Sequence, residues 1–435
     1  MVKRCGIAVI LLGLAALSCG NSGSSVSGNG PDDNLGDYVV LAWNDLGMHC
    51  LNPTYNQAVL LPPYNNLWAQ VIRRGNPPEV VTAGLVVEYA IENNTFSYGK
   101  RAYSEFWDAA VPLFGDLFSI TSLPHDIGLL GKGLSGQMDL HGDYFVAEGI
   151  PVTPVDDGDA WDPYQIALIT VKDQQGKSLV TSRTTVPTSD EINCSRCHGS
   201  DPFLDILEEH DEHNSTDLSA SMPVLCAQCH GSPALGQSGP GSSGQYLSKA
   251  IHGFHADKGP VCYDCHPGPQ TLCSRSTRHN AADGNCITCH GDVAAVAESI
   301  PSTRLPWINE PQCVACHTNV SSVATGGVLY RNARGHGGLY CIACHGSPHA
   351  MVPSDEVADN YRILQYMGSQ SKVKTLGSCG FCHNSSRGNE SEIDDFAGTH
   401  GGTGPEHSTA CNVCHTAVTY SPDHWPHAYQ WTNSN

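Results

Sequence analysis

The sequence predicts two regions of different character: an N-terminal all-β, sandwich-like domain over residues 37–190, and a domain over residues 191–435 with little regular secondary structure and short helices. Three observations support this division. Short segments rich in Val, Ile, Tyr and Trp, separated by Gly, Pro and Asn, fill the first region. Hydrophobic periodicity is scarce in the second region. The second region also holds most of the Cys and His of the chain.

Residues 1–19 predict a lipoprotein-type signal peptide. Lys3 and Arg4 precede an apolar run that is too short to cross a bilayer as a helix. The run ends in Ala-Leu-Ser-Cys at residues 16–19, which resembles a bacterial lipobox and implies that Cys19 carries a lipid anchor. A secretory signal with an incidental Cys is the alternative, and it would make the protein periplasmic or secreted.

Residues 20–36 are rich in Ser, Gly and Asn, and they predict a flexible tether between the anchor and the first domain. Strands are expected beyond the tether at residues 38–43, 68–73, 80–91, 144–152, 164–171 and 178–186. The last two segments flank a short loop with Gly176 near its end, which is typical of a β-hairpin. About 150 residues with this many strands can bury a core without a cofactor, so a two-sheet sandwich is expected.

The second region contains eight copies of the motif Cys-x-x-Cys-His. Their cysteines are Cys194 and Cys197, Cys226 and Cys229, Cys262 and Cys265, Cys286 and Cys289, Cys313 and Cys316, Cys341 and Cys344, Cys379 and Cys382, and Cys411 and Cys414. The motifs end in His198, His230, His266, His290, His317, His345, His383 and His415. Two thiols at this spacing suit thioether bonds to the vinyl groups of one haem, whose iron the adjacent His can bind. The sequence therefore predicts eight haem c groups, each with its motif His as proximal ligand.

Other uses of paired cysteines fit this pattern less well. A structural zinc site needs two such pairs and does not explain the His that follows every pair. A thioredoxin-like motif would occur once, beside alternating strands and helices. A disulfide framework also leaves the His unexplained.

From Cys194 to His415 the chain has 222 residues, or about 28 for each motif. So short a segment cannot wrap each porphyrin in a protein core of its own. We therefore expect a haem-packed domain with short helices at residues 201–209 and 293–299. Haems packed so closely favour electron transfer, because tunnelling falls steeply with distance.

The second axial ligand of each iron distinguishes an electron carrier from an enzyme, because a second His closes the site that a substrate would enter. Eleven further His are candidate distal ligands: His210, His213, His252, His255, His279, His336, His349, His400, His407, His424 and His427. Every haem can therefore be bis-His, and individual pairs stay open. At least three of these His must have other roles, for which His349, beside Pro348, is an easy candidate.

No Cys-x-x-Cys-Lys segment, the signature of pentahaem nitrite reductases, occurs in the chain. The long helices of octahaem hydroxylamine-oxidoreductase-like enzymes are not predicted either. We therefore expect no catalytic residues, and an electron carrier rather than a substrate-specific enzyme.

The chain is strongly acidic, with 43 Asp and Glu against 22 Lys and Arg. Charge of this sign excludes nucleic acid as a partner and favours basic proteins or metal cations. Cys50 and Cys273 are the Cys that belong neither to a motif nor to the signal. In an oxidising compartment they could form a disulfide between the two regions, or they could be separate thiols.

Met48, His49 and Cys50 are residue types that bind blue copper, and Met138 and His141 could complete such a set. Blue-copper sites take most of these ligands from one loop near the end of the domain, whereas here they lie near its start. We therefore expect a packing role, with capping of a haem by His49 as a minor option.

The eight motifs, the lipobox-like segment and the Gly-rich haem region resemble the multihaem (octahaem) outer-surface c-type cytochrome lipoproteins of dissimilatory metal-reducing bacteria. The resemblance covers about 60 % of the chain. Members of that family relay electrons from periplasmic carriers through outer-membrane conduits to metal oxides or other extracellular acceptors. The resemblance implies an outer-membrane or cell-surface location, with other cytochromes or a porin–cytochrome conduit as partners. Filament-forming relatives have no lipid anchor, so Cys19 argues against a filament.

Together these features predict an octahaem c-type cytochrome that relays electrons along closely packed bis-His haems in extracellular electron transfer at the outer membrane. One alternative is a multihaem reductase with an open-site haem that acts on a small nitrogen or sulfur compound. A second alternative is a subunit of a cytochrome filament or porin–cytochrome assembly.

Overall fold

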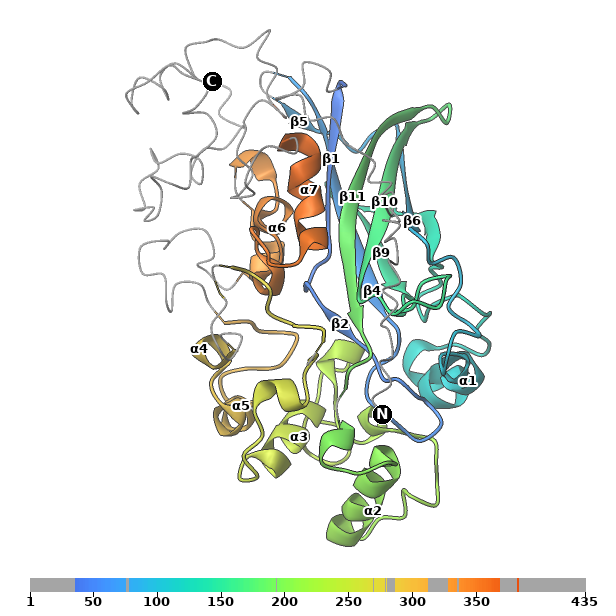
Figure 1. Ribbon diagram of the computed structural model, residues 1–435, viewed down its shortest axis with the longest axis vertical. Helices are drawn as coiled ribbons and strands as arrows, with labels where there is room; N and C mark the ends of the chain where they lie inside the picture. Colours follow the sequence, from blue (N-terminus) through green and yellow to red (C-terminus); the bar gives the residue numbers. More distant parts are fainter. Residues whose placement is uncertain are drawn as a thin grey trace, which may run out of the picture.

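The computed structural model describes residues 36–75, 78–192, 194–268, 270–277, 279, 286–311, 328–334, 336–367 and 382. The predicted signal peptide, Cys19 and nearly all of the tether lie outside these residues. Two five-stranded sheets form the centre of the described part. In Figure 1, helices α6 and α7 lie against strands β1 and β11. Helices α3, α4 and α5 lie below α6 and α7, and α2 lies at the lower end. Across these ranges, we find no helix that is both long and apolar enough to cross a bilayer.

The first sheet has the order β1-β4-β9-β8, with β5 beside β4, and its pairs are antiparallel. Its strands are β1 (Tyr38–Trp43), β4 (Asn65–Arg73), β5 (Glu79–Val80), β8 (Asp139–His141) and β9 (Tyr144–Ile150). The second sheet has the order β2-β11-β10-β6-β7, in which only β2 and β11 are parallel. Its strands are β2 (His49–Cys50), β6 (Leu85–Ile91), β7 (Ser135–Gln137), β10 (Tyr164–Asp173) and β11 (Ser178–Ser189).

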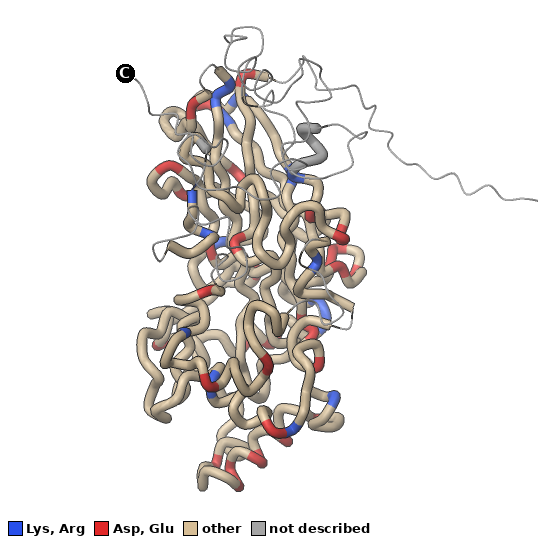
Figure 2. The backbone as a smooth tube through the Cα atoms, turned by 90° about the vertical axis from the view of Figure 1, so that its left-hand side faces the viewer, with Lys and Arg blue, Asp and Glu red and all other residues tan. Residues whose placement is uncertain are grey.

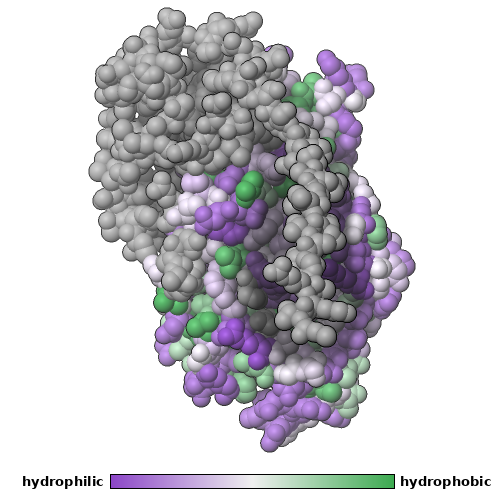
Figure 3. Space-filling view, viewed as in Figure 1, coloured by the Kyte–Doolittle hydropathy of each residue, from purple (hydrophilic) through white to green (hydrophobic). Residues whose placement is uncertain are grey.

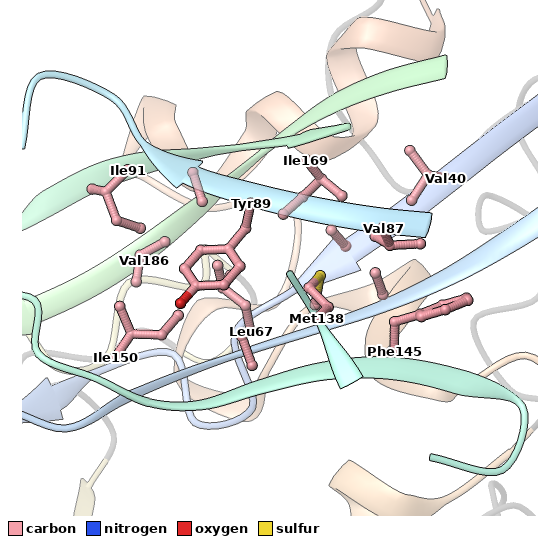
Figure 4. Close-up of a cluster of buried hydrophobic side chains, with 14 of the residues drawn as sticks. Val40, Leu67, Val87, Tyr89, Ile91, Met138, Phe145, Ile150, Ile169 and Val186 are labelled. Carbon is pink, nitrogen blue, oxygen red and sulfur yellow. The ribbon is translucent and has the colours of Figure 1, made fainter. Parts of the chain in front are cut away.

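Each of the six segments expected to be extended contains a strand, so those predictions are confirmed. Segment 80–91 is interrupted before β6, where Gly84 has a φ of +74°. The core between the two sheets explains the alternation in β10, whose inward residues are buried and whose outward residues are half-exposed. Figure 4 shows side chains from both sheets meeting in this core, among them Val40, Leu67, Phe145, Val87, Tyr89 and Ile169.

The region expected to be all-β also contains a helix, α1 (Ser104–Phe118). Its buried residues include Phe106, Trp107, Ala110 and Phe114, which recur at the three- and four-residue spacing of one helix face. Pro112 lies in the middle of this segment and normally argues against a helix, but it lies on the exposed side. The apolar face of α1 overrides that local preference.

Beyond residue 190 the described elements are short. They are α2 (Pro202–Asn214), β12 (Val224–Leu225), α3 (Leu247–His255), α4 (Cys286–His290), α5 (Val293–Ser299), α6 (Cys341–His345) and α7 (Val357–Met367). The expected helix at residues 293–299 matches α5, and the one at 201–209 lies largely within the longer α2, so both predictions are confirmed.

The two regions share buried cores. β12 pairs in parallel with β3 (Ala58–Val59), and Leu225 packs in one cluster with α1. A second cluster joins Trp43 of β1 to Tyr340 and Ile342 at the start of α6. Both of these buried clusters therefore contain residues from each side of the predicted boundary between residues 190 and 191.

Candidate haem sites

Five of the eight motifs lie wholly within the described residues, namely those that begin at Cys194, Cys226, Cys262, Cys286 and Cys341. Each forms one helical turn: the first three are short 3-10 helices, and the last two are α4 and α6. In a helical turn, residues i, i+3 and i+4 share one face. Both thiols and the His of a motif therefore lie on the same side, as attachment of one haem requires. The other three motifs lie outside the described residues, except for Cys382.

Four motif histidines each lie beside a second His. The pairs are His198 with His255, His230 with His210, His266 with His252, and His290 with His349, and their ring centroids are 6.2, 6.2, 6.0 and 6.3 Å apart. An imidazole nitrogen lies about 2.0–2.1 Å from a metal ion, so two imidazoles on opposite sides of one ion place their centroids about 6 Å apart. The spacing of all four pairs fits one iron between the two rings.

The ring planes divide these pairs into two classes. The interplanar angles are 82° for His198 with His255 and 85° for His210 with His230. In the other two pairs the angle is 25°. Among the described residues no cluster of three or more His, Cys, Asp or Glu could hold a metal ion. Two His of one pair could supply two ligands to a haem iron, whose other ligands would be the porphyrin nitrogens.

Hydrogen bonds at Nδ1 fix the orientation of most of these rings. Nδ1 of His198 lies 2.7 Å from a carboxylate oxygen of Asp205. Nδ1 of His210 lies 2.9 Å from the Thr216 hydroxyl, and Nδ1 of His230 lies 3.0 Å from the Ser243 hydroxyl. Backbone carbonyl oxygens lie near Nδ1 of the other three: that of Ser248 is 2.7 Å from His252, that of Ile251 is 2.8 Å from His255, and that of Leu46 is 3.2 Å from His349. A proton held on Nδ1 leaves the Nε2 lone pair free for a metal. At His290 the neighbour is the Arg304 guanidinium, which donates to Nδ1 at 3.0 Å.

Desolvation by neighbouring protein atoms favours the neutral form of several of these rings, which is the form that binds metals. Desolvation lowers the pKa of His266 and of His290 to about 4. Desolvation also lowers the pKa of His230, His252 and His349. Imidazoles of this kind are uncharged at neutral pH. At His290 the hydrogen bond from Arg304 leaves the ring proton on Nε2, so that proton would have to leave before Nε2 could bind iron.

Helix α3 serves two motifs at once. It carries His252, which faces His266, and His255, which faces His198. The same two motifs are joined by an ion pair between Arg196 and Asp264, with 2.7 Å between nitrogen and oxygen. The first and third motifs are therefore neighbours in space.

The third and fourth motifs line a common cavity of about 570 Å³, whose walls include Val261, Cys262, Tyr263, Ile287 and Val293. Val261 is 64 % exposed and Ile287 is 50 % exposed, although both side chains are apolar. In Figure 3 exposed apolar side chains lie over the lower left of the molecule, where α3, α4 and α5 are found. Mainly apolar walls beside a motif suit the faces of a porphyrin.

The other predicted ligands are placed differently or lie outside the described residues. His213 lies on the same helix as His210, but its ring packs beside Phe254. The backbone N–H of His279 donates to the Ser276 carbonyl at 3.2 Å. The side chain of His336 lies outside the described part of the chain, as do His400, His407, His424 and His427. His349, the easiest of the eleven to assign elsewhere, is half-buried, and its ring lies beside that of His290. Another role for His349 stays a prediction, but this contact favours a pairing with His290, because proximity to Pro348 in the sequence does not indicate which ring the side chain meets.

Met138 and His141 do not gather with His49 into the copper set considered above. His49 Nε2 lies 2.8 Å from a carboxylate oxygen of Asp45, and both side chains are buried. Met138 packs between the sheets, whereas His141 lies on an exposed strand. Cys50 and Cys273 are both free thiols, and burial raises the pKa of each.

Residues 297–346 match the family model for cytochrome c554 and c-prime. The matched segment runs from α5 through the motifs at Cys313 and Cys341. No curated protein and no solved structure matches the chain. The family match, the motifs and the facing histidines agree on one chemistry. The chain is a c-type cytochrome that carries haem c.

Proposed function

We propose that the chain is an octahaem electron-transfer cytochrome whose irons each have two His ligands. The observation that carries this proposal is the spacing of 6.0–6.3 Å between the rings of four His pairs. Haem held in this way has no open coordination position for a substrate, so it changes only its oxidation state. The axial pairs we assign are His198 and His255, His230 and His210, His266 and His252, and His290 and His349.

The contacts between motifs support a spatial haem order that differs from the order in the sequence. Helix α2 joins the second motif to the first, because it carries His210 and also Asp205, whose carboxylate contacts His198. Helix α3 joins the first motif to the third, and the cavity joins the third to the fourth. We therefore place the haems in the order second, first, third, fourth along this part of the chain.

Low-temperature EPR of the oxidised protein tests the proposal, together with intact mass of the matured chain. We expect a mass that corresponds to eight haems and EPR signals from low-spin iron alone. The perpendicular pairs predict signals with a very large maximum g value, and the near-parallel pairs predict rhombic signals. A high-spin signal that integrates to a whole haem would favour the multihaem reductase with an open site.

The proposed setting is the outer membrane or cell surface, where the lipid on Cys19 would hold the protein. The acidic surface supports docking to basic redox proteins or to metal cations, and Figure 2 shows acidic residues along α2 at the lower end. Cell fractionation of a Cys19→Ala variant tests the anchor. The variant should keep its haem and move to the soluble fraction, while retention in the membrane fraction would argue against lipidation.

A further inference from the structure

The β region reaches one of the His pairs directly. Nδ1 of His349 lies 3.2 Å from the carbonyl oxygen of Leu46, which belongs to the loop that follows β1. The His349 ring also lies beside the ring of His290, with 6.3 Å between ring centroids and 25° between ring planes. A backbone group 303 residues away in sequence therefore fixes which nitrogen of His349 carries the proton.

We propose that the loop of residues 44–47 positions His349 as an axial ligand, and that the β region thereby tunes the haem bound at Cys286 and Cys289. This inference rests on the His290–His349 pair of the proposed function. An imidazole that donates from Nδ1 to a carbonyl is a stronger electron donor through Nε2. Stronger donation stabilises ferric iron, so the Leu46 carbonyl lowers the potential of this haem.

Buried side chains inside the β region hold the loop in shape. The Asn44 side-chain oxygen accepts hydrogen bonds from the backbone N–H of Leu46 at 3.2 Å and of Gly47 at 2.7 Å. The Asn44 amide donates to Asn65 at 2.6 Å and to the Asn66 carbonyl at 2.9 Å. These hydrogen bonds therefore fix the position of the Leu46 carbonyl relative to β4.

Arg275 holds both partners of the contact. Its guanidinium donates to the Gly47 carbonyl at 2.7 Å, and its backbone N–H donates to the carbonyl of His349 at 2.7 Å. Two further bonds of 2.8 and 3.0 Å join the guanidinium to Asp359. Arg275 is only 3 % exposed, so this arrangement is rigid. Arg275 therefore ties the loop that contains Leu46 to the segment that contains His349, and this fixes the distance between them.

Gly47 allows the two regions to approach this closely. Its φ is +81°, and a Cβ built on it would lie 2.0 Å from Oγ of Ser347. Ser347 is buried and lies two residues before His349. A side chain at position 47 must therefore push the loop away from the segment that carries His349.

The test is a Gly47→Ala variant of the whole matured protein. The haem content should be unchanged, because no motif residue is altered. Spectropotentiometric titration should show one haem with a raised midpoint potential. EPR should show a change that integrates to one haem within the rhombic class, since the His290 and His349 planes differ by only 25°.

Gly84→Ala is the matched control. Gly84 has a φ of +74° in the same region, and nothing lies within 4 Å of the position that a Cβ would occupy there. This substitution carries the same backbone strain but should leave every haem signal unchanged. Adding Ser347→Gly to Gly47→Ala removes the colliding hydroxyl and should restore the potential. If Gly47→Ala prevents folding, Asn44→Ala removes the loop's acceptor without adding atoms and should shift the same haem less.

Unchanged potentials and EPR signals in a folded Gly47→Ala protein would overturn the inference, as would equal shifts in Gly47→Ala and Gly84→Ala. A His349→Ala variant separates this inference from the proposed function. If that variant keeps all of its haems low-spin, the His290–His349 pair itself is wrong. If it gains one high-spin haem while Gly47→Ala changes nothing, the pair is correct and only the tuning role fails.

Discussion

At the scale of single residues, the chemistry of each candidate site depends on which group contacts Nδ1 of its histidines. A carboxylate faces His198, carbonyl oxygens face His252, His255 and His349, and a guanidinium faces His290. These neighbours differ in charge, so chemically similar bis-His haems should differ in potential. In the proposed haem order, graded potentials would give electron flow a direction.

Replacement of His210 by Ala should convert one low-spin haem to a high-spin haem, because His230 would lose the ring that faces it. His213→Ala is the control, since His213 lies on the same helix but packs beside Phe254. EPR spin quantification of both oxidised variants checks the prediction. A high-spin signal in the His213 variant, and none in the His210 variant, would reverse the assignment of the two residues.

Replacement of Asp205 by Asn should raise the midpoint potential of the haem at Cys194 and Cys197. The Asp205 carboxylate lies 2.7 Å from Nδ1 of His198 and gives the ring anionic character, which stabilises ferric iron. A neutral amide loses most of that effect, while Asp205→Glu should preserve much of it. Spectropotentiometry of these variants and of the control Glu208→Gln, on the same helix, checks the prediction. Equal shifts from Asp205→Asn and Glu208→Gln would reveal a general charge effect instead.

At the scale of elements, sequence patterns predicted the regular parts of the fold and missed the contacts between distant segments. Segment 38–43 is a continuous apolar run with β-branched residues, and 293–299 is Ala-rich, so local preference and final structure agree there. Helix α1 was missed because Pro112 interrupts an otherwise amphipathic segment. The eight motif His could be predicted from spacing alone, because each is adjacent to its own Cys pair.

Distal ligands could be predicted only as a set. His252 and His255 are three residues apart on α3, yet they face the third and the first motif respectively. Which motif each ring meets depends on how α3 lies between them, and no local pattern encodes that arrangement. Contacts of Asp205, Arg304 and Leu46 with the paired histidines also join segments that are distant in the sequence or depend on how helices pack, so the sequence did not predict them.

The buried ion pair between Arg275 and Asp359 joins α7 to the loops around it, and its loss should weaken the whole described fold. Both side chains are less than 5 % exposed, so Asp359→Asn would leave a buried guanidinium without its counter-charge. We expect a loss of about 3–5 kcal/mol in the free energy of unfolding. Glu79→Gln breaks the exposed pair with Arg73 and should cost less than about 1 kcal/mol. Unfolding followed by circular dichroism compares the two variants, and similar losses would contradict the dependence on burial.

At the scale of the whole molecule, the two predicted regions depend on each other unequally. Among the described residues, the buried side chains between the two sheets all come from residues 40–186 of the β region. The clusters around α1 and around Trp43 take residues from both sides of the boundary. The described part of the motif region therefore packs part of its apolar surface against the β region.

This asymmetry predicts the behaviour of residues 37–190 expressed alone. The fragment should fold, because its intersheet core is intact, and it should be colourless, because no motif lies before Cys194. It should unfold at a lower temperature than the whole protein and bind a hydrophobic dye, since Val39, Leu41 and Trp43 lose the cover of residues near α6. Each such side chain gains about 1.5–3 kcal/mol from full burial, so their exposure is costly. A cooperative thermal transition with sheet-type circular dichroism would support a separable β unit. A fragment without such a transition would mean that the β region and the haem region fold only together.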